Sequence, residues 1–383
     1  MEIDCARPNS ASPPLWGRLG RWLGRGVALV VLAGCGPAGN DSGVVTSRLY
    51  VADAAGGSVS VLDATTGRHT GSPVIVGASP GQMATGPAGS VVILPAARDG
   101  AHALLHLVPR QPHTMRGRFR LEWTTGITPL GEPVREALLA ADGGRHAAVV
   151  HHLPLSEHEG AARCQLLIID LHDGRVVRTQ PVCGAHERTV GLALEETPTG
   201  PAVYLAIEEA GPVSLSELTR GRVVALNGSG DFTASSRLWG VPTQLALGPR
   251  SDGLERLLYV VETRSGQNME PPLPYDGRLL RLSPHTLQPE AEATLDVMPT
   301  RLTVGPRDAV YLLAGDVLTS MEPANGRVNW SLRLPARGIA LAVAAETVYV
   351  ASAYEGRLWR VDGRTGRHLD TAVVNARPSA LLH

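Results

Sequence analysis

A unit of strand-like sequence recurs along the 383-residue chain, and this repeat limits the possible folds more than any other feature. Each copy contains an apolar triplet with tyrosine or valine at its centre. Seven such triplets occur, at residues 49–51, 91–93, 148–150, 203–205, 258–260, 310–312 and 348–350. Alternating apolar residues with turn signals about every ten residues indicate an all-β protein. Because a period of roughly 40–55 residues with four strands is typical of a propeller blade, the sequence predicts a seven-bladed β-propeller of four-stranded antiparallel blades.

The first unit lacks one strand. When the strands of each unit are labelled A to D in chain order, the triplet lies in strand B. A Pro- or Arg-led strand A precedes the last six triplets but not the first. The C-terminal segment 377–382, RPSALL, has the pattern of the missing strand. Both chain ends are therefore expected to share blade one, which would close the ring and remove exposed sheet edges.

Strand C often ends in a turn of the form acid-x-x-x-Gly-Arg. This motif begins at Asp63, Asp170, Glu322 and Asp362. Glycine supplies the positive φ angle that a tight hairpin turn requires, so each motif is predicted to connect strands C and D.

Two of the units resemble a known repeat family. RLYVADAAGGSVSVLDATTGR at 48–68 and TVYVASAYEGRLWRVDGRTGR at 347–367 resemble the YVTN-type β-propellers, and the resemblance extends over 47–383. DVLTSMEPANGRVNW at 316–330 instead resembles the pyrroloquinoline-quinone-type repeat. The resemblance implies the propeller fold and an extracytoplasmic binding or scaffold role. It does not imply an activity, because one fold hosts many functions.

The N-terminus has the order of features found in an export signal. Arg18, Arg21 and Arg25 precede the short apolar run 27–33, which leads into Leu32-Ala33-Gly34-Cys35. This run is too short to span a bilayer, which takes about 20 residues. LAGC resembles the bacterial lipobox, in which the cysteine is lipidated. We therefore expect a signal peptide at 1–34, a lipidated Cys35 with a flexible tether at 35–46, and the propeller at 47–383. An ordinary signal peptide or an uncleaved anchor is the alternative.

The expected location follows from this anchor. Acyl chains on Cys35 would hold the domain at a membrane of the bacterial cell envelope without a spanning helix. The residue after the cysteine is Gly36 rather than Asp, which favours the outer membrane, with the domain in the periplasm or at the cell surface.

Three consecutive B–C connections are longer than the others, at 151–163, 208–221 and 262–277. All B–C connections of a propeller open on one face, so these three are predicted to form a binding rim over blades three to five. Neutral insertion is the alternative, since surface loops tolerate it. The candidate rim residues are His152, Glu157, His158, Glu208, Glu209, Glu262, Arg264, Tyr275 and Asp276.

His152 and His158 are the candidates for a metal site, because imidazole beside carboxylate can bind zinc or a similar ion. Their spacing matches no established metal motif, so a solvated polar loop is the favoured interpretation and no metal or other cofactor is predicted. The chain contains no C-x-x-C-H, G-x-S-x-G or G-x-x-x-x-G-K-[ST] motif, and no catalytic residue is assigned. The formal net charge of −1 gives no reason to expect a nucleic-acid partner.

Cys164 and Cys183 flank the predicted C–D hairpin of blade three. Counting outward from Asp173-Gly174 places them opposite each other, within disulfide reach. An exported compartment permits oxidation, so we predict a structural disulfide.

These observations favour a non-catalytic, monomeric binding or scaffold module that recognises a protein or glycan partner in the envelope. The alternative is a propeller enzyme, either a metal-assisted lyase or hydrolase or a quinone-dependent oxidoreductase. Its site would lie in the central funnel or in the rim of blades three to five. A third possibility, a partner in outer-membrane protein assembly, depends on analogy alone.

Overall fold

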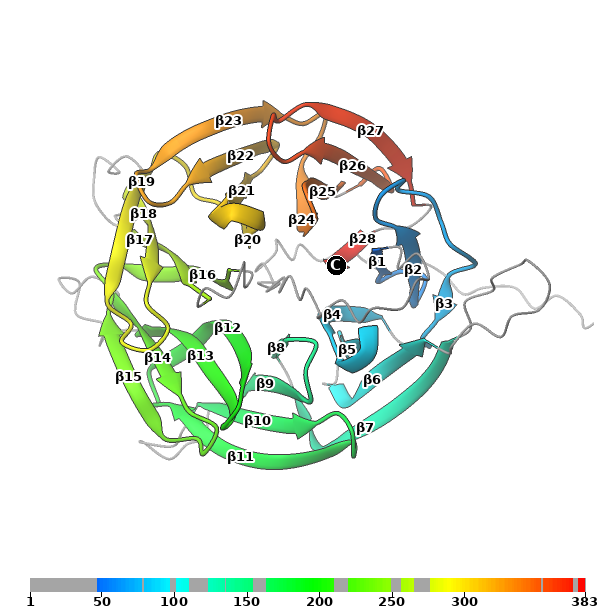
Figure 1. Ribbon diagram of the computed structural model, residues 1–383. Helices are drawn as coiled ribbons and strands as arrows, with labels where there is room; N and C mark the ends of the chain where they lie inside the picture. Colours follow the sequence, from blue (N-terminus) through cyan, green and yellow to red (C-terminus); the bar gives the residue numbers. More distant parts are fainter. Residues whose placement is uncertain are drawn as a thin grey trace, which may run out of the picture.

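The computed structural model describes residues 47–77, 79–96, 101–109, 123–134, 136–153, 163–209, 220–248, 256–264, 276–352, 354–374 and 378–382. They form seven four-stranded antiparallel sheets arranged as blades around a ring (Figure 1), which confirms the predicted all-β propeller. The expected signal peptide, tether and lipid site at Cys35 lie outside the described residues, as do Glu157, His158 and Tyr275 of the candidate rim.

In blades two to seven the first strand in the chain lies nearest the axis and the last lies at the circumference, whereas in blade one the C-terminal strand lies nearest the axis (Figure 1). Blades one to three, from the axis outward, are β28 (Pro378–Leu382), β1 (Arg48–Asp53), β2 (Ser58–Asp63) and β3 (Val74–Ile75); β4 (Pro80–Thr85), β5 (Val91–Pro95), β6 (Ala101–Pro109) and β7 (Trp123–Val134); and β8 (Leu138–Ala141), β9 (His146–His152), β10 (Cys164–Asp170) and β11 (Arg175–Cys183).

Blades four to seven, in the same order, are β12 (Glu187–Thr197), β13 (Gly200–Glu209), β14 (Arg220–Leu226) and β15 (Phe232–Arg237); β16 (Val241–Leu247), β17 (Leu258–Arg264), β18 (Asp276–Leu282) and β19 (Pro289–Leu295); β20 (Arg301–Val304), β21 (Val310–Ala314), β22 (Val317–Glu322) and β23 (Arg327–Arg333); and β24 (Gly338–Ala344), β25 (Thr347–Ser352), β26 (Arg357–Asp362) and β27 (His368–Val373). Two short 3-10 turns, η1 (Pro87–Gly89) and η2 (Pro306–Asp308), complete the described elements. Among the described residues, no helix is long and apolar enough to cross a membrane.

The seven predicted triplets all lie in the second strand of a blade, where both faces of the strand are covered by neighbouring blades. In β1, for example, Leu49, Val51 and Ala52 are fully buried and Tyr50 nearly so. A strand packed on both sides needs a continuous apolar run, and the triplets supply it. The outer strands alternate instead, and β15 and β23 present mainly polar side chains to solvent.

The C-terminal strand closes the ring as predicted. β28 pairs antiparallel with β1, with Leu381 opposite Val51, and it also packs against the inner strands β24 and β4. Ala380, Leu381 and Leu382 are fully buried. Blade one is therefore assembled from the two ends of the chain.

The inner strand of blade three differs from the sequence-based expectation. The Pro-led strand A predicted before the third triplet covers 133–140, from Pro133 to Ala140, whereas the structure has β8 at Leu138–Ala141. Val134 instead ends β7, where it pairs with Ala101 of β6. The long hairpin of blade two therefore takes the first residues of the expected strand.

The acid-x-x-x-Gly-Arg motifs form the predicted turns between the third and fourth strands. Oδ1 of Asp63 accepts hydrogen bonds from the N–H groups of Thr65 and Thr66. In blade seven, Oδ1 of Asp362 accepts the equivalent bonds from the N–H groups of Arg364 and Thr365. Gly67 and Gly366 follow with φ angles of 69° and 70°, where a side chain would be strained.

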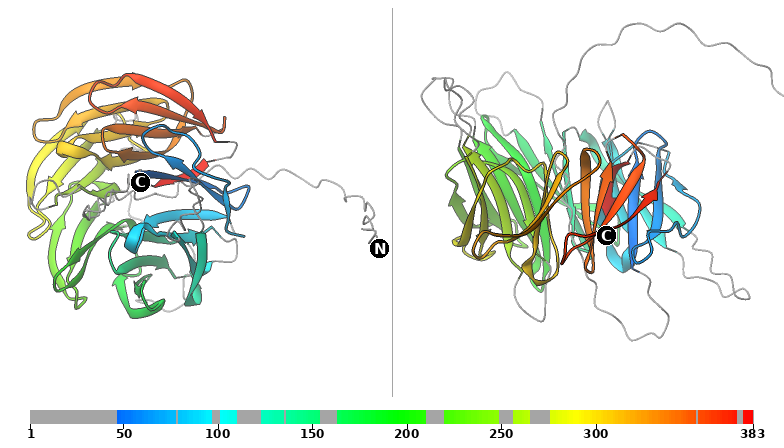
Figure 2. Two further views of the ribbon diagram at one scale, coloured as in Figure 1. Left: turned by 45° about the vertical axis from the view of Figure 1, so that its right-hand side comes forward. Right: turned by 90° about the horizontal axis from the view of Figure 1, so that it is seen from above.

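Two names describe the ends of the ring. The loop face carries the connections from second to third strands and those between blades; the turn face carries the other connections, including the acid-x-x-x-Gly-Arg turns. Figure 2 shows the strands running through the thickness of the ring between these faces. β1 begins on the turn face, because Arg48 pairs with Asp63 at the start of such a turn.

Candidate functional site

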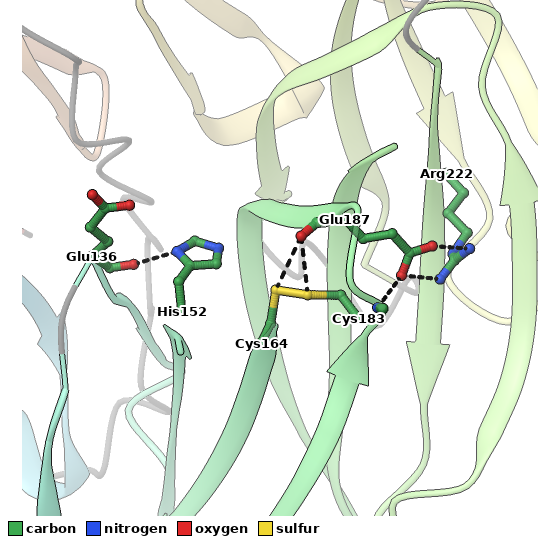
Figure 3. The surroundings of a disulfide bond; sticks show 7 residues. Glu136, His152, Cys164, Cys183, Glu187 and Arg222 are labelled. Atoms are coloured by element: carbon green, nitrogen blue, oxygen red, sulfur yellow. Dashed lines mark hydrogen bonds and ion pairs between the residues drawn. A yellow bond between two sulfur atoms is a disulfide. The ribbon is translucent and has the colours of Figure 1, made fainter. Parts of the chain in front are cut away.

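The candidate site is the loop face of blades three to five, where the three long connections begin and end. In blade three a disulfide joins Cys164 at the start of β10 to Cys183 at the end of β11, with Cα atoms 5.1 Å apart (Figure 3). The two cysteines are direct partners in the sheet, as predicted. The hairpin begins with Asp170 opposite Arg175, and two register shifts then bring Cys164 opposite Cys183.

His152 ends β9 in the same row of the sheet, opposite Cys164. Its Nδ1 lies 2.8 Å from the carbonyl oxygen of Glu136 and donates a hydrogen bond to it (Figure 3). Nε2 is buried and has no partner within the described residues. Burial lowers the pKa of His152, and the positive charge of Arg188 lowers it further, although the bond to Glu136 acts in the other direction. The ring is therefore neutral at pH 7 and fixes the end of β9 to the start of blade three.

An arginine between two carboxylates holds the corresponding point of blade four. Nη1 of Arg222 in β14 lies 2.7 Å from Glu187 Oε1 and 3.1 Å from Glu209 Oε1. Glu187 begins β12 and Glu209 ends β13, so one guanidinium group joins three strands. Glu187 also accepts a hydrogen bond from the Gly184 N–H, and its carbonyl oxygen faces both sulfur atoms of the disulfide (Figure 3).

Blade five contains the most deeply buried of these ion pairs. Glu262 in β17 has no exposed surface. Its Oε1 accepts a hydrogen bond of 2.9 Å from Arg278 Nε in β18, and its Oε2 accepts one of 3.0 Å from the Gly240 N–H. The Arg278 guanidinium lies 4.6 Å from the centre of the Trp239 ring and also pairs with Glu292 of β19. A buried carboxylate requires this degree of pairing.

The predicted rim residues therefore have different surroundings. Glu209 and Glu262 hold the loop bases, while Glu208 is half-buried and lies opposite Arg188 in the sheet. Arg264 and Asp276 are the last pair between β17 and β18. A binding role for the rim remains a prediction.

Sequence reasoning did not single out Glu136, Glu187, Arg222 or Arg278 as site residues. The available signal was the Gly-Arg pair at the second and third positions of the third strand after two of the long connections, at Gly221-Arg222 and Gly277-Arg278. Within the ranges that the structure describes, no group of three or more His, Cys, Asp or Glu side chains is arranged to hold a metal ion. Because His158 lies outside those ranges, its pairing with His152 stays a prediction.

The turn face has an open hollow of about 500 Å³ between blades two and three, lined by Pro87, Gly143, Gly144, Arg145 and His172. Arg145 lies in this hollow and pairs with Asp170 at 2.5 Å. The hydrogen bond from Arg145 is the main reason that the pKa of Asp170 falls to about 2. The arginine is thus already neutralised by its partner.

Comparisons with known proteins extend these observations. Residues 292–381, under a quarter of the chain, match the family model described as outer membrane protein assembly factor BamB. This segment covers blades six and seven and contains the stretch that resembles the pyrroloquinoline-quinone-type repeat, so repeats of that type are supported. No curated protein matches the chain.

Several solved structures have a similar fold. Apo AztD from Citrobacter koseri is 14% identical with a TM-score of 0.52, over 88% of this chain and 97% of that one. The dihydro-heme d1 dehydrogenase NirN in complex with DHE is 14% identical with a TM-score of 0.54, over 89% and 76%. Hydrazine synthase from Kuenenia stuttgartiensis is 13% identical with a TM-score of 0.58, over 83% and 93%. Identities this low show the fold alone.

Proposed function

We propose that the protein is a lipid-anchored, non-catalytic binding or scaffold module of the bacterial cell envelope. The loop face of blades three to five would recognise a protein or glycan partner. One observation carries this proposal: the base of each of the three long connections is held by bonds that differ in chemistry but occupy the same place.

In blade three these bonds are the disulfide and the hydrogen bond from His152 to the Glu136 carbonyl. In blade four they are the Arg222 ion pairs, and in blade five the Glu262–Arg278 pair. Bonds at a loop base reduce the conformational freedom that would be lost when the loop binds a partner. Neutral insertions give no reason for such bonds to recur in three adjacent blades. A rigid scaffold that presents long loops is a common arrangement for recognition.

Photo-crosslinking in the native envelope tests the proposed surface. A photoreactive residue would replace Glu157, Val213 or Glu270 in the full chain, one in each long connection. Arg364 is the matched control, because it is exposed on the turn face. We expect a discrete adduct from the loop positions that the unlabelled purified protein suppresses by competition. Adducts of equal yield from position 364, or none from the loops, would contradict the proposal.

The anchor has its own test. Cys35→Ala in the full chain should move the protein from the membrane fraction to the soluble fraction and abolish labelling with a radioactive fatty acid. Unchanged membrane association and labelling would remove the anchor from the proposal while leaving the binding surface untouched.

The family match favours a second, more specific form of this function, a role in outer-membrane protein assembly. Depletion of the protein should then lower the amount of folded outer-membrane proteins, measured by their heat-modifiable mobility in gels. Normal amounts would exclude this form without affecting the general one. A stoichiometric metal ion or a bound quinone in protein purified from its native envelope would instead favour the enzyme alternative.

A further inference from the structure

A side-chain position near the loop face recurs in the inner strands. In blade two this position is Gln82. It lies two residues before Ala84, which pairs with Val92 at the centre of the triplet. The Gln82 amide spans the junction with blade three, since Nε2 donates to the Ala137 carbonyl and Oε1 accepts from the Leu139 N–H. Both polar groups of this side chain are satisfied by the next inner strand.

Arg301 occupies the equivalent position in blade six, because Thr303 pairs with Tyr311 at the centre of its triplet. Leu302 and Val304 belong to the apolar cluster shared with blade five. Side chains alternate along a strand, so Arg301 and Thr303 point the other way, toward blade seven. Figure 1 shows β20 and β24 as the neighbouring inner strands at this junction, and the two strands pack against each other.

Two buried polar groups on this face of β20 have no partner among the described residues. The Arg301 Nη1 donates a hydrogen bond of 2.7 Å to the Thr300 carbonyl. Its Nε is buried and has no partner among the residues described. Thr303 is fully buried, and within the same residues its hydroxyl also has no partner. Buried polar groups of this kind are expected to be completed by a ligand or by water.

The charge on this junction is not balanced either. Arg337, an exposed arginine just before β24, is the charged group that acts on Arg301. Neither Arg301 nor Arg337 has an ion pair within the described residues. Burial lowers the pKa of Arg301, and the charge of Arg337 lowers it further. Two guanidinium groups together, one of them partly buried, favour a bound counter-charge.

We infer that Arg301 and Arg337 bind a small oxyanion, a carboxylate or a phosphate group, at the loop-face end of the junction between β20 and β24. The planar guanidinium group matches the geometry of both oxyanions and can donate two parallel hydrogen bonds to either. The Thr303 hydroxyl is the next polar group on the same face of the strand. This site lies in blades six and seven and does not depend on the binding surface proposed for blades three to five.

Isothermal titration calorimetry on the full chain tests this site, with inorganic phosphate and acetate as separate probes at constant ionic strength. We expect saturable binding of at least one probe, and the stronger probe identifies the class of oxyanion. Arg301→Gln should weaken it at least tenfold and Arg337→Gln several-fold. Arg327→Gln, which changes an exposed arginine on β23, should bind as the parent does. No saturable binding of either probe, or equal binding by the Arg301→Gln variant, would overturn the site.

The melting temperature without added oxyanion provides a second measurement. Glutamine is the natural residue at the equivalent position of blade two, so Arg301→Gln should fold. Because the substitution removes an uncompensated charge, its melting temperature should equal or exceed that of the parent. A clear decrease would show that Arg301 serves the fold rather than a ligand.

Discussion

Blades six, seven and one are joined on the turn face by bonds that recur with the repeat, whereas the bonds that hold the long connections of blades three, four and five lie on the loop face. On the first side, the tyrosine at the centre of a triplet reaches the next blade. Tyr311 donates to the Gly363 carbonyl at 3.2 Å, and Tyr349 donates to the Ala64 carbonyl. Tyr50 extends the series to blade two through the Gly89 carbonyl.

The bonds at the bases of the long connections lie within single blades. Each of them joins strands of one sheet: the disulfide in blade three, the Arg222 ion pairs in blade four and the Glu262–Arg278 pair in blade five. The difference separates two requirements. The tyrosine bonds between blades recur with the repeat and hold the ring together. The bonds at the loop bases hold the three long connections, which are not part of the repeat.

A Gly-Arg pair makes the contrast direct, because it lies near the start of the third strand in both blade five and blade seven. In blade five Arg278 turns inward to a fully buried carboxylate. In blade seven, after a short connection, Arg357 is 53% exposed and lies 3.6 Å from its neighbour Glu355. The same two residues therefore have a structural role only where a long connection must be held.

The largest expected effect tests the regular side of the ring, blades six, seven and one, whose bonds follow the repeat. Deleting residues 377–383 removes β28, in which Leu381 and Leu382 are fully buried. Burial of one leucine is worth about 1.5–3 kcal/mol, so we expect a loss above about 5 kcal/mol once the strand pairing is included. The melting temperature measures it, with deletion of His383 alone as the control. A truncated protein with the full melting temperature would show that β28 does not close the ring.

The Gly-Arg contrast predicts the next largest effect. Arg278→Gln leaves the buried Glu262 without its cation and should cost about 3–5 kcal/mol. Arg357→Gln should cost less than about 0.5 kcal/mol, because exposed pairs contribute little. Urea denaturation of both variants measures the difference. Equal losses would mean that the two sides do not differ in how they use this arginine.

Reduction of the disulfide should have a smaller effect. Its sequence separation of 19 residues corresponds to about 3 kcal/mol in the loop-entropy model. A reductant should lower the melting temperature of the parent protein but leave the double variant Cys164→Ala and Cys183→Ala unchanged. Intact mass confirms the bond, and two free thiols in the untreated protein would contradict it.

The smallest effect compares two tyrosines at equivalent positions. Tyr349→Phe removes a buried hydrogen bond to the Ala64 carbonyl and should cost about 1 kcal/mol. Tyr259→Phe should cost nothing measurable, because the Tyr259 hydroxyl is buried without a partner in the described part of the chain. Thermal unfolding of the two variants decides. A larger loss for Tyr259→Phe would mean that this hydroxyl is bonded after all.

The regular side could be predicted from the sequence because its bonds follow the repeat. The triplets, the turn glycines and the closing strand are local patterns, and each fixes a strand or a turn by itself. The disulfide was also predictable, although two register shifts rather than a simple count bring Cys164 opposite Cys183.

The loop bases could not be predicted in the same way. Glu262 looks like any acidic loop residue in the sequence, and its burial depends on Arg278 and on the Gly240 N–H of another strand. Arg301 posed the same difficulty, because its direction toward blade seven follows from the register of β20 and not from the sequence around it. These features depend on contacts between segments that have no shared pattern.

The starting point of β1 has a consequence for how the protein would stand on a membrane. The chain enters the ring at Arg48 on the turn face, opposite the long connections. If Cys35 carries the proposed lipid, the twelve residues 36–47 would allow a separation of at most roughly 40 Å between the lipid and the ring. With such an anchor, the shortest arrangement would place the turn face toward the bilayer, and the long connections of blades three to five would then face the aqueous compartment. A partner could then approach the loops without displacing lipid headgroups.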